Sequence, residues 1–336
     1  MHRYLSALLL LSAAFAQSNY HQLRKITIGG EGGWDYLIAD AANSRIYVSH
    51  GAEVAVVDAK TGQVAGRITG LHGVHGIALA PEFNRGFISN GQSSTVTIFD
   101  LKTLGKIGED VPAGKNPDAI IYDPGSKRVF AFNGRSSDAT AIDAKDGKVA
   151  GTVALEGKPE FAAADGKGHV YVNIEDKSMV FDIDSKKLTV EHRWSLAPCE
   201  EPSGMAMDTK SHRIFSGCHN KMVAVMNADT GKVVATPEIG DGVDATAFDP
   251  ETKFVFNSCG DGTLSIAHED SPDKYSVVEQ VKTVQRARTM ALDSKTHNVY
   301  LAIADFEPAP AAAAGDKAAQ RPKVVAGSFG LLEYGR

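Results

Sequence analysis

The sequence predicts an all-β fold, a seven-bladed β-propeller of four-stranded antiparallel blades. A short phrase recurs seven times: a polar or basic residue and one or two small or apolar residues precede an aromatic residue that opens a β-like run. The repeated aromatic residues are separated by 40 to 44 positions and are Tyr47, Phe87, Phe130, Tyr171, Phe215, Phe256 and Tyr300. This period, with several short strands per unit, is typical of propeller blades. The units lack helical periodicity and are rich in Val, Ile, Phe, Tyr and Gly, which argues against two-helix repeats.

Length and composition favour one globular body over residues 17–336. The chain has 336 residues, 43% of them hydrophobic, which is enough to form a core and argues against disorder. The repeats run almost from end to end, so a second domain is not expected. The formal net charge is −6 and no run of Lys and Arg is present, which argues against nucleic-acid binding.

Residues 1–16 have the pattern of a secretory signal peptide. His2 and Arg3 precede an apolar stretch from Leu5 to Phe15, and Ala14-Phe15-Ala16 fits the small-x-small rule for cleavage after Ala16. No later segment is apolar enough to cross a membrane. We therefore expect a bacterial protein that is exported to the periplasm or secreted, without a transmembrane segment, as a monomer.

The second unit illustrates how each blade is read. Strands are expected at residues 75–80, 87–90, 96–100 and from 106 onward, separated by turns. Third strands end at an aspartate in several units, as at Asp58, Asp100 and Asp143, just before a Lys-containing turn. Asp in such a position bonds to the backbone of the turn, so we interpret these residues as turn caps rather than as metal ligands.

The two chain ends are expected to share the last blade. After Tyr300, residues 307–322 form an Ala/Pro-rich stretch that we interpret as an exposed loop insertion, and residues 327–334 contain a single strand pattern. The last unit therefore lacks a fourth strand. Residues 23–28 form an unassigned strand pattern that is similar to the fourth strands at 63–68 and 148–153. We predict that this segment completes the last blade and removes an exposed sheet edge.

The runs Arg45–Ser49 and Val54–Gly62 resemble the bacterial YVTN repeat family, also called YncE-like propellers. The resemblance covers nearly all of the chain after residue 16 and implies a seven-bladed propeller. Members of this group are mostly exported binding or surface proteins without an assigned reaction, which is what the resemblance implies here. Propellers host several enzyme classes as well, so the fold does not decide function.

The starts of the first strands carry a set of polar residues. In a propeller, first strands begin and second strands end at the same mouth of the central channel. Counting eleven or twelve positions back from each repeated aromatic residue gives Asp35, His75, Asp118, Glu160, Ser203, Asp244 and Arg288. We interpret these seven residues as a ligand-binding ring whose carboxylates would attract a cation. Residues that start strands at a solvent-filled mouth are also polar without any ligand, so this alternative stays open.

Further candidates come from the ends of the second strands, three positions after the aromatic residues. We include His50, Asn90 and Asn133 in the predicted ligand-binding set, together with His219, which follows Cys218. His72 and His75 have a spacing that could place two imidazoles on one ion, and imidazole with carboxylate suits Zn or Cu. No HExxH or paired CxxC motif accompanies them. We expect no cofactor, with a divalent metal as the open alternative.

The three cysteines are Cys199, Cys218 and Cys259. Cys199 precedes the first strand of the fifth unit and Cys218 ends the second strand of that unit, so both are expected on the same face of one blade. Export permits a disulfide, and we predict one between Cys199 and Cys218. Cys259 then remains a free, buried thiol.

These features leave three functional hypotheses. The first is a non-catalytic protein that binds a small-molecule ligand or a protein partner at the mouth. The second is a metal-dependent hydrolase or lyase whose ion is held at the same mouth by His75, nearby carboxylates and His50. The third is an interaction scaffold that uses blade edges and residues 307–322. The sequence contains no serine nucleophile elbow, phosphate loop, dinucleotide fingerprint or haem attachment motif.

Overall fold

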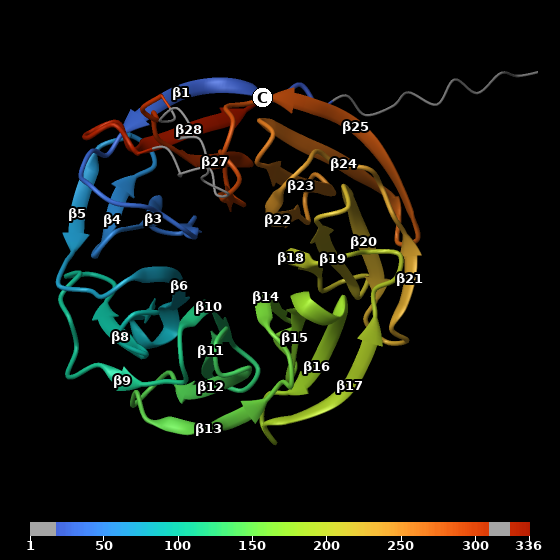
Figure 1. Cartoon of the computed structure of the whole chain (residues 1–336), viewed down its shortest axis with the longest axis horizontal. Coiled ribbons are helices and arrows are strands. Elements are labelled where there is room, and N and C mark those ends of the chain that lie inside the picture. The colour runs from blue at the N-terminus through green and yellow to red at the C-terminus, as the bar shows by residue number, and fades with distance from the viewer. Residues whose placement is uncertain (1–17, 309–322) are drawn as a thin grey trace, which may run out of the picture.

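The computed structural model describes residues 18–308 and 323–336 and confirms the predicted propeller. Seven four-stranded antiparallel sheets form a ring around a central channel (Figure 1). We number the sheets as blades 1 to 7, beginning with the sheet that contains β2. The expected signal peptide and residues 309–322 of the expected loop insertion lie outside the described residues.

The two inner strands of each blade surround the channel. The innermost strands are β2 (Leu37–Asp40), β6 (Val74–Ala80), β10 (Pro117–Asp123), β14 (Pro159–Ala164), β18 (Pro202–Asp208), β22 (Val243–Asp249) and β26 (Met290–Asp293). The second strands are β3 (Arg45–His50), β7 (Arg85–Asn90), β11 (Arg128–Asn133), β15 (His169–Ile174), β19 (Arg213–Cys218), β23 (Phe254–Cys259) and β27 (Asn298–Ile303).

The two outer strands of each blade complete the sheet toward the rim of the ring. The third strands are β4 (Glu53–Asp58), β8 (Thr95–Asp100), β12 (Asp138–Asp143), β16 (Met179–Asp184), β20 (Met222–Asn227), β24 (Thr263–Ser271) and β28 (Gly330–Gly335). The outermost strands are β5 (Val64–Ile68), β9 (Val111–Pro112), β13 (Val149–Ala154), β17 (Thr189–Ser195), β21 (Lys232–Ala235), β25 (Lys274–Lys282) and β1 (His21–Thr27). Two short 3-10 turns, η1 (Pro81–Phe83) and η2 (Glu175–Lys177), follow β6 and β15.

The hydrophobic core is divided into seven clusters, and each cluster fills the seam between two neighbouring blades. The repeated aromatic residue of each blade lies in a different cluster, so every seam contains one of them. Each is buried, and in chain order they are Tyr47, Phe87, Phe130, Tyr171, Phe215, Phe256 and Tyr300. A single blade cannot bury both faces of its sheet, so these seams supply the hydrophobic stabilisation of the whole ring.

The chain ends join as the sequence predicts. β1 pairs with β28 in an antiparallel register that places Ile26 opposite Leu331, and β28 pairs on its other side with β27. Buried Glu333 accepts hydrogen bonds from Arg24 of β1, from the Asn298 side chain at 2.7 Å and from the Tyr300 hydroxyl at 2.8 Å. The first and last parts of the described chain therefore stabilise the same blade, and β1 covers the edge of β28 that would otherwise be unpaired.

The aspartates that end the third strands cap turns, as expected. Asp58 Oδ1 accepts hydrogen bonds from the backbone N–H groups of Lys60 and Thr61 at 2.9 and 2.8 Å. Asp100 and Asp143 make the same pair of bonds to the second and third residues that follow each of them. These carboxylates are thus occupied by local turn bonds at the outer side of the blades.

Blade 2 departs from the expected strand pattern. A full fourth strand was expected from residue 106, but β9 contains only Val111 and Pro112, and Lys106 makes one isolated bridge to Phe99. Gly108 has a positive φ of 67°, which turns the chain away from the sheet, and Pro112 has no N–H to donate. These two residues interrupt the ladder that the hydrophobic pattern alone predicted.

Within residues 18–308 and 323–336, no helix has the length and hydrophobicity needed to cross a membrane.

The shared last blade can be tested with a pair of substitutions in β1. Ile26 is 3% exposed in the seam between blades 7 and 1, whereas Leu23 on the same strand is 43% exposed. We expect Ile26→Ala to lower the free energy of unfolding by about 2–4 kcal/mol, because it leaves a cavity in a packed core. Leu23→Ala should cost less than about 1 kcal/mol. Urea unfolding would measure both, and equal small losses would mean that β1 does not contribute to the closed ring.

Candidate binding site at the channel mouth

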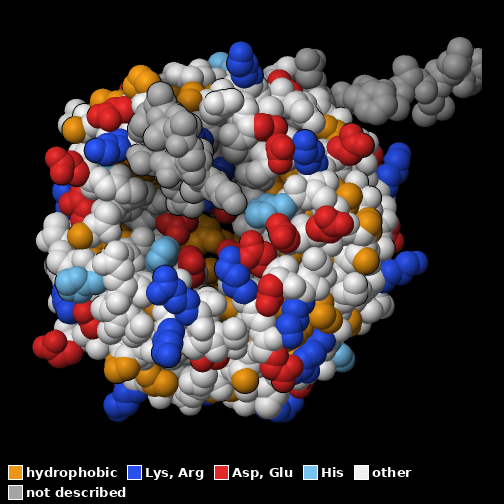
Figure 2. Space-filling model, viewed as in Figure 1, with side chains coloured by type: hydrophobic (Ala, Val, Ile, Leu, Met, Phe, Trp, Pro, Cys, Tyr) orange, Lys and Arg blue, Asp and Glu red, His pale blue; other side chains and the backbone are white. Residues whose placement is uncertain are grey.

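Six of the seven residues predicted from the starts of the first strands line one polar basin at the channel mouth. We call this basin, with a volume of about 210 Å³, the vestibule. Its lining residues come from loops and strand starts of several blades and are Asp35, Tyr36, Asp118, Lys158, Glu160, Glu175, Ser203, His219, Asp244 and Arg288. Figure 2 shows acidic, basic and histidine side chains gathered around the opening, with hydrophobic side chains visible deeper in the channel.

His75, the seventh predicted residue, stands between two of the vestibule carboxylates. Its Nδ1 lies 2.6 Å from Oδ2 of Asp35 and 3.6 Å from Oδ1 of Asp118. These three residues come from neighbouring blades 1, 2 and 3, and one ligand atom of each lies within 4.8 Å of the others. His72 is exposed, so the imidazole of His75 is paired with carboxylates rather than with a second histidine.

The opposite side of the vestibule contains two ion pairs. The ammonium of Lys158 lies 2.7 Å from a carboxylate oxygen of Glu160 and also bonds to Glu175. Arg288 Nε lies 3.1 Å from Oδ2 of Asp244, whose other oxygen accepts a hydrogen bond from Ser203 at 3.1 Å. The five carboxylates that line the vestibule therefore face two cationic side chains, which leaves an excess of negative charge.

Small polar side chains of the second strands hold the backbone of the ring. Ser89 donates a hydrogen bond to the carbonyl of Asp118 at 2.5 Å, and Asn173 donates one to the carbonyl of Ser203 at 2.8 Å. Ser49 accepts the Asp35 N–H at 2.9 Å, and Ser258 donates to the carbonyl of Arg288. These positioning residues lie two places after the repeated aromatic residues. The prediction missed them because it counted three places forward.

His50, Asn90 and Asn133, which were predicted by counting three positions forward from the aromatic residues, do not line the vestibule. Asn90 and Asn133 are buried and donate hydrogen bonds to Thr97 at 2.8 Å and Thr140 at 3.0 Å, within their own blades. His50 is 1% exposed and stacks on Phe329, with ring centroids 4.0 Å apart. Successive side chains of a strand point to opposite faces of the sheet. The residue three positions after the aromatic residue therefore faces away from the vestibule backbone, to which the residue two positions after it bonds.

An aromatic pair closes the vestibule from below. Tyr36 of blade 1 meets Phe161 of blade 4 edge to face across the channel, with ring centroids 4.9 Å apart. Beyond this pair, toward the other mouth, lies an apolar cavity of about 440 Å³ that all seven innermost strands help to line. Tyr36 borders both cavities, so the vestibule is a polar basin with an aromatic floor.

Tyr36 also brings a polar atom to this floor. The residue is 7% exposed and lines the vestibule, and its hydroxyl is not one of the fully buried polar atoms that lack a partner among the described residues. Burial raises its pKa well above the usual value, and the charges of Asp118, Asp35, Asp244 and Glu160 add to the rise. A hydroxyl at the surface of a polar basin can bond with a ligand or a water molecule.

Three of the vestibule carboxylates, those of Asp118, Glu160 and Asp244, are harder to ionise than in water. Burial raises the pKa of Asp118 to about 6, and the charge of Asp35 adds to the rise while His75 opposes it. Burial likewise raises the pKa of Glu160 to about 7, against the hydrogen bond from Lys158. Burial lowers the pKa of His75, but the bond to Asp35 and the charge of Asp118 outweigh it, and the net change is upward. A cation placed here would favour the ionised carboxylates.

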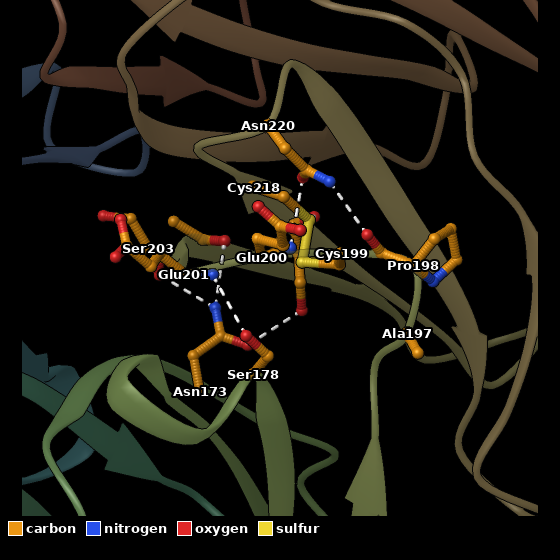
Figure 3. The surroundings of a disulfide bond; sticks show 12 residues. Asn173, Ser178, Ala197, Pro198, Cys199, Glu200, Glu201, Ser203, Cys218 and Asn220 are labelled. Atoms are coloured by element: carbon orange, nitrogen blue, oxygen red, sulfur yellow. Dashed lines mark hydrogen bonds between the residues drawn. A yellow bond between two sulfur atoms is a disulfide. The ribbon is translucent and has the colours of Figure 1, made fainter.

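The predicted disulfide between Cys199 and Cys218 is present, with Cα atoms 5.5 Å apart, and Cys259 is free and buried. Figure 3 shows Glu200 and Glu201 beside this disulfide. The Asn220 side chain accepts the N–H of Glu200 at 3.1 Å and donates to the carbonyl of Pro198 at 2.8 Å. The disulfide and these bonds attach the loop that carries both glutamates to the end of β19.

A second group of potential ligands lies on three adjacent strands of blade 4, outside the vestibule. His169 Nδ1 is 2.9 Å from Oδ1 of Asp182, and Glu191 contributes a third atom within 4.8 Å. The three residues come from β15, β16 and β17. Sequence reasoning did not identify this group, because strand register, which brings the residues together, is not visible in spacing along the chain.

Comparisons with known proteins support the fold. No family model matches the chain, and no curated protein matches it. A chain of hydrazine synthase from Kuenenia stuttgartiensis is similar in structure, with a TM-score of 0.70 and 16% identity over 82% of this chain and 94% of that chain. A chain of the mitotic checkpoint complex is similar with a TM-score of 0.74 and 15% identity, over 90% of this chain and 94% of that chain. At these identities the similarity shows the β-propeller fold alone.

The raised pKa of Glu160 gives a stability test. The folded state holds a proton on this residue up to a pH of about 7, whereas the unfolded chain releases it near 4.5, so stability declines as pH rises through this window. A shift of one pKa unit corresponds to about 1.4 kcal/mol of stability. The variant Glu160→Gln has no carboxyl to titrate at this position, so its free energy of unfolding should not show this decline. Relative to the wild type, we expect its free energy of unfolding to rise by on the order of 1–3 kcal/mol as pH is raised from about 4.5 to about 7.

Urea unfolding at both ends of the window would measure this difference. Glu156→Gln is a matched control, because Glu156 is exposed in the loop between β13 and β14 and lines neither the vestibule nor the apolar cavity. A Glu160→Gln profile parallel to the wild-type profile would contradict the assignment.

Proposed function

We propose that the protein is an exported, non-catalytic binding protein whose vestibule holds a small organic cation. The observation that carries the proposal is the basin itself, in which five carboxylates face two cationic side chains above the ring of Tyr36. An ammonium group would bond to the carboxylates of Asp35 and Asp118, and its alkyl part would rest on the rings of Tyr36 and Phe161. Aromatic faces and carboxylates together are well suited to cationic ligands.

Binding without catalysis is favoured because four of the five vestibule carboxylates already have a close partner, while Asp118 lies 3.6 Å from His75 and is the one most open to a ligand. Glu160 is paired with Lys158, Asp244 with Arg288 and Ser203, and Asp35 with His75. A general acid or base needs free access to the reacting proton, which these partners restrict.

Export is supported by two independent features. Residues 1–16 have the pattern of a signal peptide, and the disulfide between Cys199 and Cys218 belongs to an oxidising compartment. The resemblance to YVTN and YncE-like propellers, which are mostly exported binding proteins, agrees with both.

Calorimetric titration with n-butylamine tests the proposal. We expect binding that strengthens as pH rises from about 5 to about 8, because Asp118 and Glu160 ionise in this range while the amine keeps its charge. Asp118→Asn and Tyr36→Phe should each weaken binding by about tenfold, which corresponds to about 1.4 kcal/mol.

Butyrate, which has the same chain with the opposite charge, serves as the ligand control. Glu251→Gln, which removes an exposed carboxylate remote from the vestibule, serves as the protein control. Equal binding of butyrate and n-butylamine, or no binding of either, would contradict the proposal.

A metal-dependent hydrolase or lyase is the second candidate, and the geometry of Asp35, His75 and Asp118 favours it. One imidazole and two carboxylates are a ligand set that Zn accepts. In such a site these three residues would hold the ion, which would activate a water molecule for attack on a substrate. His50 was expected to join this set, but it stacks on Phe329 away from the vestibule.

Metal analysis of the purified protein separates the two candidates. If the vestibule holds an organic cation, we expect no stoichiometric ion, whether or not a chelator was used. If it is a metal site, a stoichiometric ion should be found in the wild type and in His72→Ala, and it should be lost from His75→Ala. His72 is the matched control because it is exposed and close to His75 in the sequence.

A further inference from the structure

One face of blade 4 carries ionisable side chains where most other blades carry apolar ones. In each blade, the repeated aromatic residue of the second strand pairs with a buried residue of the third strand. This partner is apolar in five blades, as Val56, Ile98, Ala141, Val225 and Ile266. It is acidic in blade 7, as Glu333, and in blade 4, as Asp182. A buried carboxylate is costly unless other groups replace its bonds to water.

The two buried carboxylates differ in the partners that they have. Glu333 is bonded by Arg24, Asn298 and Tyr300. Asp182 is only 2% exposed, yet among the described residues it is bonded by the imidazole of His169 alone, whose Nδ1 lies 2.9 Å from Oδ1. One donor leaves most of the acceptor capacity of a carboxylate unused. Asp182 is therefore a buried acceptor that a further ligand would complete.

Two more side chains able to bind a metal ion lie beside Asp182. In the ladder between β16 and β17, His192 pairs with Asp182, and the adjacent Glu191 is the extra residue of a β-bulge (Figure 1). Directly paired residues share a face of the sheet, and a bulge redirects the extra side chain. One ligand atom each of His169, Asp182 and Glu191 lies within 4.8 Å of the others. Burial raises the pKa of Asp182, and the charges of His169 and His192 oppose the rise.

The other blades show that the fold does not require these residues. The same bulge occurs in blades 1, 3, 5 and 6, where the extra residue is Ala65, Ala150, Val234 and Val278. The residue in the place of His192 is Gly66, Gly151, Ala235 and Glu279, of which only the last is ionisable. The place of His169 is taken by arginine in four blades, as Arg45, Arg85, Arg128 and Arg213. Blade 4 thus departs from the repeat at four neighbouring positions, each time to a residue that can bind a metal ion.

We propose that His169, Asp182, Glu191 and His192 form a site for one Zn²⁺ ion. Two imidazoles and two carboxylates are ligands that Zn²⁺ accepts in a four-coordinate site. Bonds of about 2.0–2.2 Å place neighbouring ligand atoms of Zn²⁺ about 3.0–3.5 Å apart, so His169 and Asp182 need little movement. The ion would take the place of the proton between them. It would join β15, β16 and β17, and it would supply the partner that buried Asp182 lacks. The site lies outside the vestibule, so it does not depend on the proposed function.

Calorimetric titration with ZnCl₂ tests the inference. His75→Ala serves as the background, so that the group of Asp35, His75 and Asp118 does not add a second ion. We expect this protein to bind one Zn²⁺ per chain and not to bind Mg²⁺ at the same concentration, because Mg²⁺ prefers oxygen ligands. Glu191 and His192 are exposed, so the ion exchanges with solvent and is supplied in the titration rather than carried through purification.

Two variants, each added to this background, assign the ion to blade 4. Asp182→Asn should weaken Zn²⁺ binding by at least about 100-fold, because losing a ligand costs no less than losing a side chain that orients one. Glu191→Gln/His192→Gln should weaken binding by a similar factor. Both of its residues are exposed, so this variant is expected to fold even if Asp182→Asn does not.

His212→Gln is the matched control. His212 Nδ1 lies 2.9 Å from Oδ1 of Asp229 in blade 5, the same distance as in the pair of His169 and Asp182. Within the described part of the chain, however, this pair belongs to no group of three potential ligands. We expect His212→Gln to leave the affinity for Zn²⁺ unchanged.

Three outcomes would overturn the inference. Absence of Zn²⁺ binding by the His75→Ala protein would leave His169 and Asp182 as an ion pair without a metal. Undiminished binding in Glu191→Gln/His192→Gln would place the ion elsewhere, and a loss in His212→Gln as large as in that variant would mean that exposed histidines bind Zn²⁺ without a defined site.

Discussion

The seams between blades are the constraint on which the rest of the structure depends. Each four-stranded sheet has two apolar faces, and it can bury them only against its two neighbours, so the ring is stable only when it is closed. One repeated aromatic residue fills each seam, from Tyr47 between blades 1 and 2 to Tyr300 between blades 7 and 1. The last seam needs a strand from the other end of the chain, and β1 supplies it by pairing with β28.

The same closure creates the vestibule. Because every innermost strand runs in the same direction relative to the channel, the residues at the strand starts meet at one mouth. Asp35, Asp118 and Asp244 belong to blades far apart in the sequence, yet they line one basin. Ser89 and Asn173 bond to the backbone of this ring, so the scaffold that stabilises the propeller also fixes the position of the charges.

Burial and charge oppose each other in the vestibule. Burial raises the pKa of Asp118 to about 6 and that of Glu160 to about 7, so these groups are ionised at a cost near neutral pH. Lys158 and Arg288 relieve part of this cost, and an incoming cation would relieve more. The vestibule thus combines fixed negative charge with an aromatic floor, which are the two features on which the proposed binding of an organic cation rests.

The sequence by itself determined the number of blades, the sharing of the last blade, the ring of seven polar residues at the strand starts and the disulfide between Cys199 and Cys218. These features follow from periodicity and from the direction of strands, which spacing along the chain records. Tertiary structure alone decided that His50, Asn90 and Asn133 face away from the vestibule, that Tyr36 meets Phe161 across the channel, and that Lys158 pairs with Glu160 and Glu175. Side-chain direction depends on strand parity and bulges, and contacts across the channel join residues with no sequence relation, so spacing could not reveal them.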